Sequence, residues 1–226
     1  MIQEDCPRQS DQSVKYKIRR SGPLDAYIYK EWKDQKNVEE RKQDVMVHTP
    51  TIPVEVSKDK VLHIFTDGAC TNNGKRNASA AWGCLLVSDL GHVVLDRFSA
   101  AVPLSEPQTN QRAELRGILK GVELAEEKLK ADPSLTRVQI WSDSQYSINC
   151  ASVWGPNWKK AGWKKQGGPI QHLDLIQPLV LATQRLGMKL YYKWLKAHKM
   201  GESQYAFPWC FNHQVDALAT GALRHS

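Results

Sequence analysis

Two apolar segments of this chain end on an aspartate, and this repeated pattern limits the possible folds more than any other feature. Residues 60–67, KVLHIFTD, and residues 136–143, TRVQIWSD, have the composition of buried strands. Each segment passes directly into small or polar residues after Asp67 or Asp143. Because the carboxyl ends of strands in an α/β sheet border the crevice where ligands bind, the pattern predicts two carboxylates at such a crevice.

Strand and helix patterns alternate along the rest of the chain after residue 60. Residues 79–102 favour two strands around a turn at 89–91, and residues 188–198 favour a fifth strand. Helix patterns cover residues 109–132, 144–154, 173–187 and 212–223, with Pro178 predicting a kink or a start inside the third. This order predicts an α/β fold with a mixed five-stranded sheet and helices on both faces.

Residues 1–58 differ in composition from residues 59–226. They hold 11 Lys and Arg against 10 Asp and Glu with few aliphatic side chains, and residues 31–45 favour a short charged helix. Residues 59–226 hold 20 Lys and Arg against 14 Asp and Glu, and so carry +6 of the total formal charge of +7. We therefore expect a charged, partly disordered extension over 1–58, or a small folded module, followed by one folded domain over 59–226.

Cysteine usage and the lack of long apolar segments limit the class of protein. The five cysteines include no CxxC pair, and their odd number argues against a disulfide framework or a zinc site. No apolar run of about 18 residues predicts a membrane span, and the polar N-terminus resembles neither a secretory signal nor a transit peptide. We expect an intracellular protein in a reducing compartment, with nucleus, cytoplasm and mitochondrion open, and no membrane partner. The positive charge favours a partner with phosphates, although many ordinary proteins share it.

Four acidic residues are candidates for a shared site. Asp67 and Asp143 end strands, Glu114 lies near the start of a predicted helix, and Asp216 lies among apolar residues of the last helix. Taken singly, each has an ordinary explanation as a turn former, a helix cap, a dipole-complementing residue or a solvent-facing charge. Taken together, an oxygen-only set without His or Cys suits hard cations such as Mg²⁺ or Mn²⁺, which would also relieve the repulsion between carboxylates.

Four segments that contain these acids resemble, in the same order, the acidic motifs of type 1 ribonuclease H of the cellular type. They are TDGAC followed by Asn73, then TNQRAEL, SDSQY and NHQVDALA, and the resemblance covers about residues 60–226. It implies a ribonuclease H-like fold and an endoribonuclease that hydrolyses the RNA strand of RNA–DNA hybrids, leaving 5′-phosphate and 3′-hydroxyl ends. It also implies that Asp67, Glu114, Asp143 and Asp216 are catalytic and bind two Mg²⁺ ions about 4 Å apart, with Mn²⁺ as a substitute.

His198 matches the mobile-loop histidine of this family, to which proton transfer or product release is assigned. A lone histidine is more often a surface residue, so only the resemblance makes His198 a catalytic candidate. Ala197 stands where glycine is typical, and the stretch from His198 to Asp216 is several residues longer than in compact members. The aromatic side chains of this longer stretch favour local packing, with an interaction surface as the alternative; they are Tyr205, Phe207, Trp209 and Phe211.

Residues 154–165 interleave tryptophans with lysines and contain no acid. Lysines can contact phosphates and tryptophans can stack on sugars or bases, although packing of the tryptophans in a helical hairpin is the alternative. The resemblance places this segment in a basic helical protrusion that grips the DNA strand, next to a DNA channel. The residues expected to contact nucleic acid here are Tyr146, Trp158, Lys159, Lys160, Trp163, Lys164 and Lys165.

A second group of expected contacts comes from the resemblance alone. Asn73, Asn110 and Gln111 match family positions that contact the hybrid, where a wide minor groove exposes the 2′-hydroxyls of RNA. Thr109 matches part of a DNA-phosphate pocket. Two other positions of that pocket differ from those of well-described relatives. Pro107 stands where they have an arginine, and Gln171 stands where they have an asparagine. We therefore expect this pocket to bind the DNA phosphate more weakly.

Two alternatives compete with an active cellular enzyme. The first is a catalytically impaired protein of the same fold that only binds hybrids or other nucleic acid, which the altered phosphate pocket favours and the presence of all four acids opposes. The second is a ribonuclease H domain derived from a retroelement polyprotein, with residues 1–58 as a linker remnant, which the basic protrusion opposes. The expected partner is an RNA–DNA hybrid, and we expect a monomer.

Overall fold

The chain divides into two compact units, Met1–Val56 and Ser57–Ser226. The structure, a computed structural model, describes residues 16–20, 26–30, 60–89, 92–197 and 206–223. In the first unit, strands β1 (Tyr16–Arg20) and β2 (Ala26–Lys30) form an antiparallel pair in which Tyr16 lies opposite Lys30. The helix expected over residues 31–45 lies outside the described residues.

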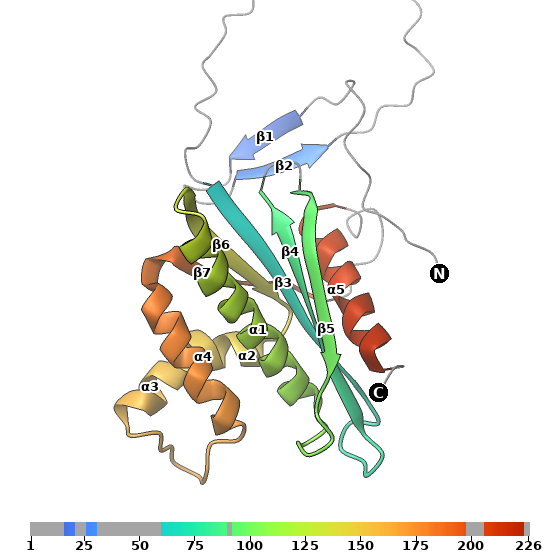
Figure 1. Ribbon diagram of the computed structural model, residues 1–226, viewed down its shortest axis with the longest axis vertical. Helices are drawn as coiled ribbons and strands as arrows, with labels where there is room; N and C mark the ends of the chain where they lie inside the picture. The colour runs from blue at the N-terminus through green and yellow to red at the C-terminus, as the bar shows by residue number, and fades with distance from the viewer. Residues whose placement is uncertain (1–15, 21–25, 31–59, 90–91, 198–205, 224–226) are drawn as a thin grey trace, which may run out of the picture. The chain divides into compact units, whose positions relative to one another are not determined.

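A mixed sheet of five strands forms the centre of the second unit, with the order β5-β4-β3-β6-β7 (Figure 1). β4 pairs antiparallel with β3 and with β5, whereas β6 pairs parallel with β3 and with β7. The mixed sheet expected from the sequence is therefore confirmed. The strands are β3 (Lys60–Thr71), β4 (Ser79–Ser88), β5 (Val94–Ala101), β6 (Leu135–Ser142) and β7 (Leu190–Trp194).

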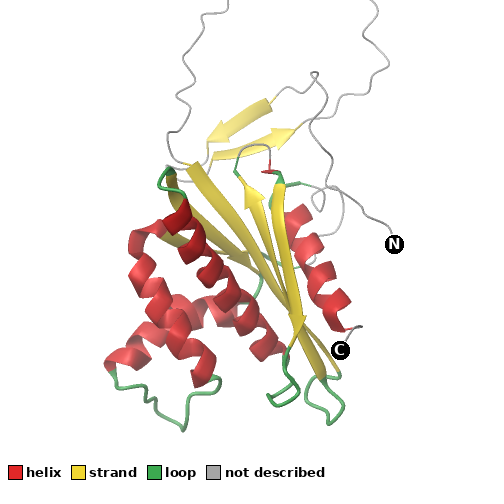
Figure 2. Ribbon diagram, in the orientation of Figure 1, coloured by secondary structure: helices red, strands yellow, loops and turns green. Residues whose placement is uncertain are grey.

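Helices cover both faces of this sheet. Figure 2 shows α1 and α4 over one face and α5 over the other. The helices are α1 (Asn110–Ala131), α2 (Gln145–Asn149), α3 (Gly155–Lys160), α4 (Leu173–Leu186) and α5 (Trp209–Ala222), with a π-helical turn η3 (Cys150–Trp154) and a 3₁₀ turn η4 (Gly187–Lys189). The helical segment after β6 is longer than predicted, because it continues beyond Trp154 into α3, and Pro178 lies inside α4 rather than at its start.

The alternation of side chains along β3 divides the core into two layers. Ile64 faces α1, where it lies close to Gly121, and Phe65 faces α5, where its ring centroid lies 5.3 Å from that of Phe211. Trp141 of β6 stacks on Phe65 at 5.8 Å. Since full burial of one large apolar side chain contributes about 1.5–3 kcal/mol, these contacts hold β3 rigidly between the two helical layers.

Two glycines allow helices to reach the sheet backbone close to Asp67. A Cβ atom at Gly68 would lie 2.8 Å from the carbonyl carbon of Ala113 in the first turn of α1. A Cβ atom at Gly83 would lie 2.7 Å from the carbonyl oxygen of Val215 in α5. Any larger residue would push these helices away, so the two glycines determine how closely the acids of α1 and α5 approach β3.

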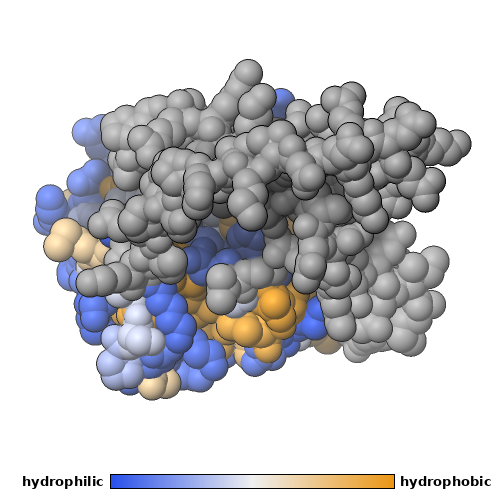
Figure 3. Space-filling view, turned by 90° about the horizontal axis from the view of Figure 1, so that it is seen from above, coloured by the Kyte–Doolittle hydropathy of each residue, from blue (hydrophilic) through white to orange (hydrophobic). Residues whose placement is uncertain are grey.

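One face of the described residues shows a mixed polarity. The face drawn in Figure 3 combines hydrophilic residues with a smaller hydrophobic area. None of the helices in the described part of the chain is both long enough and apolar enough to cross a membrane.

Candidate active site

Asp67, Glu114, Asp143 and Asp216 line one cavity of about 240 Å³. They come from four places in the chain, since Asp67 lies on β3, Glu114 near the start of α1, Asp143 directly after β6, and Asp216 on α5. Carboxylate oxygens of the first three lie within 4.8 Å of one another. The structure therefore brings together the four acids that the sequence singled out. The cavity is also lined by Gly68, Ala69, Asn110, Trp209, Asn212 and His213.

Burial and repulsion raise the pKa values of two members of this cluster, Asp67 and Glu114. Burial, followed by repulsion from Asp143 and Asp216, raises the pKa of Asp67 to about 8, although the N–H of Gly68 donates to its Oδ1 at 2.8 Å. Burial and repulsion from Asp67 and Asp143 raise the pKa of Glu114 well above its usual range. A divalent cation among these groups would favour their ionised forms and so reverse both shifts.

Two residues that line the cavity each carry a buried oxygen that lacks a hydrogen-bond partner among the described residues. They are Oε2 of Glu114 and Oδ1 of Asn212. A buried acceptor without a partner costs about 1–3 kcal/mol, so its presence in a folded protein calls for an explanation such as a bound ligand. Because the donors of the cavity are mostly carboxylate and amide oxygens, the residues present fit a hard divalent cation.

The start of α1 is held in place by two side chains that the sequence assigned to nucleic-acid contacts. Oγ1 of Thr109 caps the helix by accepting the N–H of Arg112 at 3.2 Å, and Oδ1 of Asn73 accepts the N–H of Asn110 at 3.3 Å. The side chain of Asn110 lines the carboxylate cavity and hydrogen-bonds Glu114. Of these expected contact residues, Asn110 therefore lines the cavity, and Thr109 and Asn73 hold the helix start that carries it.

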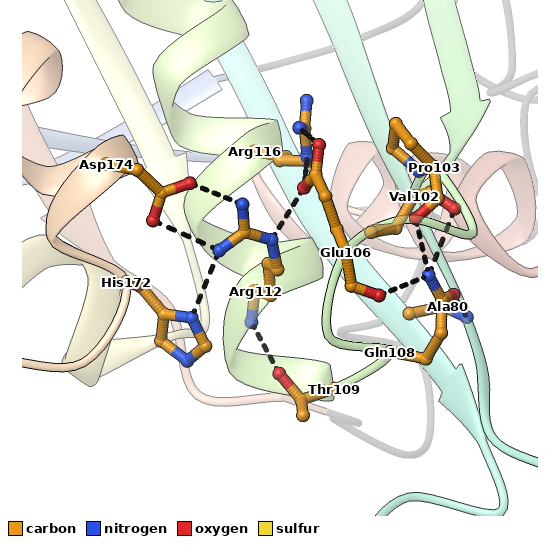
Figure 4. Close-up of polar contacts among 10 residues, drawn as sticks. All are labelled: Ala80, Val102, Pro103, Glu106, Gln108, Thr109, Arg112, Arg116, His172 and Asp174. Atoms are coloured by element: carbon orange, nitrogen blue, oxygen red, sulfur yellow. Dashed lines mark hydrogen bonds and ion pairs between the residues drawn. The ribbon is translucent and has the colours of Figure 1, made fainter. Parts of the chain in front are cut away.

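An ion-pair network, which the sequence did not suggest, holds α1 to the segments on both sides (Figure 4). The guanidinium of Arg112 is buried, and its Nε donates to Glu106 at 2.6 Å. Its two terminal nitrogens donate to Asp174, one of them at 3.2 Å, and Nη1 also donates to Nδ1 of His172 at 3.4 Å. Arg116 pairs with the same Glu106, and its Nε donates at 3.0 Å. Both cations are thus neutralised within the fold.

The loop that precedes α1 is fastened by one amide side chain, Gln108. Its Oε1 accepts the N–H of Ala80 at 3.0 Å, which joins the loop to β4. Its Nε2 donates to three backbone carbonyls, those of Val102, Pro103 and Glu106, at 3.2, 2.8 and 3.1 Å. The cap of α1 is therefore fixed relative to the sheet.

A second cavity, of about 310 Å³, lies among the aromatic residues that the sequence assigned to the DNA channel. The ring of Trp158 lies 6.1 Å from that of Trp154, and Nζ of Lys165 lies 6.0 Å from the Trp158 ring. The tryptophans thus pack against each other and also line a cavity. Its lining residues are Gln111, Tyr146, Trp154, Trp158, Lys165, Ile170 and Gln171.

The remaining lysines of this region lie on α3 or shortly after it. Lys160 and Lys164 are exposed, and Nζ of Lys159 donates to Oε1 of Gln184 at 2.6 Å. Trp163 is half-buried against the core, and its backbone N–H donates to the carbonyl of Trp158 at 2.6 Å.

The longer stretch before Asp216 is described only in its second half. His198 and Tyr205 lie outside the described residues. Phe207 and Phe211 pack against each other at 6.1 Å between ring centroids, as the local-packing interpretation predicts, whereas Trp209 lines the carboxylate cavity. Asn212 also lines this cavity, although the sequence analysis does not predict it as a site residue. Its position four residues before Asp216, about one helical turn, is the sequence feature that places both side chains on the same face of a helix.

Comparison with known proteins gives consistent matches. The family described as RNase H matches residues 59–224. Ribonuclease H of Thiobacillus denitrificans is 31% identical over 140 residues, which cover 61% of this chain and 82% of that protein. Ribonuclease H of Schizosaccharomyces pombe is 33% identical over 169 residues, 74% of this chain but 56% of that protein, so the chain matches little more than half of that relative. The solved structure of the PFV RNase H domain has a similar fold, with a TM-score of 0.61 at 19% identity over 74% of this chain and 96% of that domain.

Proposed function

The chain belongs to the RNase H family, and from this premise we infer that it is an endonuclease that hydrolyses the RNA strand of RNA–DNA hybrids. The observation that carries the inference is the convergence of four carboxylates, from β3, α1, the end of β6 and α5, on one cavity. In the reaction, the oxygen of a water bonds to phosphorus, the bond to the 3′ oxygen breaks, and that oxygen takes up a proton. The products then carry 5′-phosphate and 3′-hydroxyl ends.

Asp67, Glu114, Asp143 and Asp216 are the residues that would hold the divalent metal ions on which this family depends. Magnesium is the expected metal, as a pair of ions, with Mn²⁺ as a substitute. Such ions supply charge neutralisation, orientation of the scissile phosphate and activation of the attacking water. Asp67 would be the central ligand, because its carboxylate shares one cavity with those of Glu114, Asp143 and Asp216.

The chain itself contributes the geometry in which the reaction occurs. The close contact at Gly68 and the two packed layers hold Asp67 on a rigid strand, and the amide of Asn110 orients Glu114. Such preorganisation lowers the barrier because the charged groups need not rearrange during the reaction. His198, outside the described residues, is proposed to move a proton or assist product release.

The two cavities fit the two strands of one hybrid. Asn110 lines the carboxylate cavity and its neighbour Gln111 lines the aromatic cavity, so the first turn of α1 lies between them. The RNA strand would pass the acids near Asn73 and Asn110. The DNA strand would pass the aromatic cavity, where Trp158 offers a stacking surface and the surrounding lysines offer phosphate contacts.

A binding protein without catalysis is the second candidate. It is favoured by the changed phosphate pocket, since Pro107 and Gln171 carry no charge and the nearby guanidinium of Arg112 is already paired with Glu106 and Asp174. A cleavage assay on an end-labelled hybrid, with duplex RNA and duplex DNA alongside, separates the two. We expect Mg²⁺-dependent cleavage of the RNA strand of the hybrid alone. Tight binding of the hybrid without cleavage in Mg²⁺ or Mn²⁺ would establish the second candidate instead.

A further inference from the structure

We propose that Asn212 supplies a neutral oxygen ligand, directly or through one water, to a divalent cation in the carboxylate cavity. This inference rests on the cation role proposed above and adds a fifth protein group to it, one that is not an acid.

The first support is the environment of the Asn212 side chain. Asn212 is 8% exposed and lines the same cavity as the four acids. Its carbonyl oxygen Oδ1 is buried and accepts no hydrogen bond from the described residues. Oε2 of Glu114, in the wall of the same cavity, has the same lack of a partner. Two such acceptors in one small cavity indicate a shared ligand, because a folded protein rarely leaves either one without a partner.

The second support is the orientation of α5, which tertiary packing fixes. Phe211 and Val215 are 1% and 0% exposed and face the sheet, and the carbonyl of Val215 lies against Gly83. Residues one position further along the helix, Asn212 and Asp216, therefore turn together toward the cavity. Because they are four residues apart, their side chains lie on one face of α5, and the amide oxygen is placed beside a proposed metal ligand.

The third support is the charge of the site. Four carboxylates already converge on this one cavity, so a fifth would add to their mutual repulsion. Hard cations nevertheless prefer six or more oxygen ligands, and one oxygen of Asp67 is engaged by the N–H of Gly68. An amide oxygen adds a ligand without adding charge.

A purely structural role makes a different prediction. If the amide acted through its N–H groups, by donating to a neighbouring carboxylate, the oxygen would be dispensable and the donors essential. Asn212→Asp keeps the oxygens and loses the donors, whereas Asn212→Leu loses both at nearly the same size. The two substitutions therefore separate an oxygen ligand from a hydrogen-bond donor.

The experiment is a titration of the full chain with Mn²⁺ by isothermal titration calorimetry, without nucleic acid, so that catalysis is not the readout. The variants are Asn212→Asp, Asn212→Leu and the control Gln214→Ala, which lies on the same helix outside the cavity lining. We expect Asn212→Leu to weaken Mn²⁺ binding about tenfold, the scale seen when a group supporting a metal site is removed. We expect Asn212→Asp to bind Mn²⁺ at least as tightly as the wild type, and Gln214→Ala to match it.

Equal weakening in both Asn212 variants, or no change in Asn212→Leu, overturns the proposal. If Asn212→Leu fails to fold, Asn212→Asp decides: an affinity at or above that of the wild type supports the oxygen ligand, and a lower one overturns it. A wild-type chain that binds no Mn²⁺ would remove the proposed cation role altogether. Wild-type binding with unaltered Asn212 variants would remove only this inference.

Discussion

Two clusters of potential metal ligands lie along β3, and they differ in how their polar atoms are satisfied. Asp67, Glu114 and Asp143 form one, and His63, Asp89 and His92 form the other; in each, the ligand atoms lie within 4.8 Å of one another. Proximity therefore does not distinguish them. The carboxylate cluster opens onto a cavity, whereas His63 is buried among aromatic rings.

The hydrogen bonds of the histidine cluster show why it is not an equivalent site. The indole N–H of Trp141 donates to Nδ1 of His63 at 3.2 Å, and Nε2 of His63 lies 3.1 Å from Asp89. Because an indole nitrogen only donates, Nδ1 must be the acceptor, and the ring proton sits on Nε2, where it donates to Asp89. No lone pair of His63 is then free for a metal. Saturated hydrogen bonding indicates a structural cluster, and buried oxygens without partners indicate a ligand site.

The largest expected effect comes from breaking the carboxylate cluster. Asp67→Asn should lower the rate of hybrid cleavage by about three orders of magnitude or more, the scale of losing a central catalytic group, while the chain still folds. Single-turnover cleavage and thermal melting measure the two properties. Cleavage that continues in this variant, or in the wild type with EDTA, would contradict a metal-dependent mechanism.

The carboxylate cluster should also make stability depend on pH. The folded pKa of Asp67, about 8, lies above its unfolded value of about 3.9, so the folded state binds the extra proton between these values. Stability in EDTA should therefore fall, by roughly a few kcal/mol, as pH rises from 4 toward 8. Urea unfolding across this range tests it, and Asp67→Asn should reduce the fall. A stability that rises steadily over this range in EDTA, unchanged by the substitution, would refute the coupling.

A substitution in the histidine cluster should lower the stability of the fold without changing metal binding. His63→Leu leaves the indole N–H of Trp141 and the carboxylate of Asp89 without their partner, and we expect a loss of about 1–3 kcal/mol in the free energy of unfolding. Urea unfolding measures the loss, and Mn²⁺ affinity should equal that of the wild type. A His63→Leu variant with weakened Mn²⁺ binding would place this cluster in the metal site after all.

The smallest expected effect concerns lysines that belong to neither cluster. Changing Lys159, Lys160, Lys164 and Lys165 together to Ala should weaken hybrid binding and flatten its dependence on salt, by up to about 0.9 in slope for each phosphate that a lysine no longer neutralises. Binding is measured in the Asp67→Asn background so that no hybrid is cleaved. Mn²⁺ affinity of the lysine variant should not change. An unaltered salt slope would show that this surface does not hold the hybrid.

Much of the site could be predicted locally, because a strand or a helix is determined largely by residues close to it in the sequence. The apolar runs that end at Asp67 and Asp143, and the helical spacing after Thr109, needed no distant partner to be recognised. The local sequence pattern predicts that Glu114 and Asp216 lie on helices, but it does not predict that they lie near Asp67 and Asp143. Their inclusion with Asp67 and Asp143 came from the resemblance to a family, since spacing alone does not say which helix faces which strand.

Local patterns in the sequence predict the order of the elements, the mixed sheet and the position of Asp143 directly after β6. The strand predicted to end at Asp67 is longer than expected, because β3 continues to Thr71 and Asp67 lies inside it, opposite Gly83. Contacts between distant segments determine how closely α1 and α5 approach Asp67 through Gly68 and Gly83, and hence that Asn212 lines the cavity. The same holds for the pairing of Arg112 with Glu106 and Asp174. The physical reason is that hydrophobic periodicity acts over a few residues, whereas cavities, orphaned oxygens and buried ion pairs depend on contacts between segments distant in the chain.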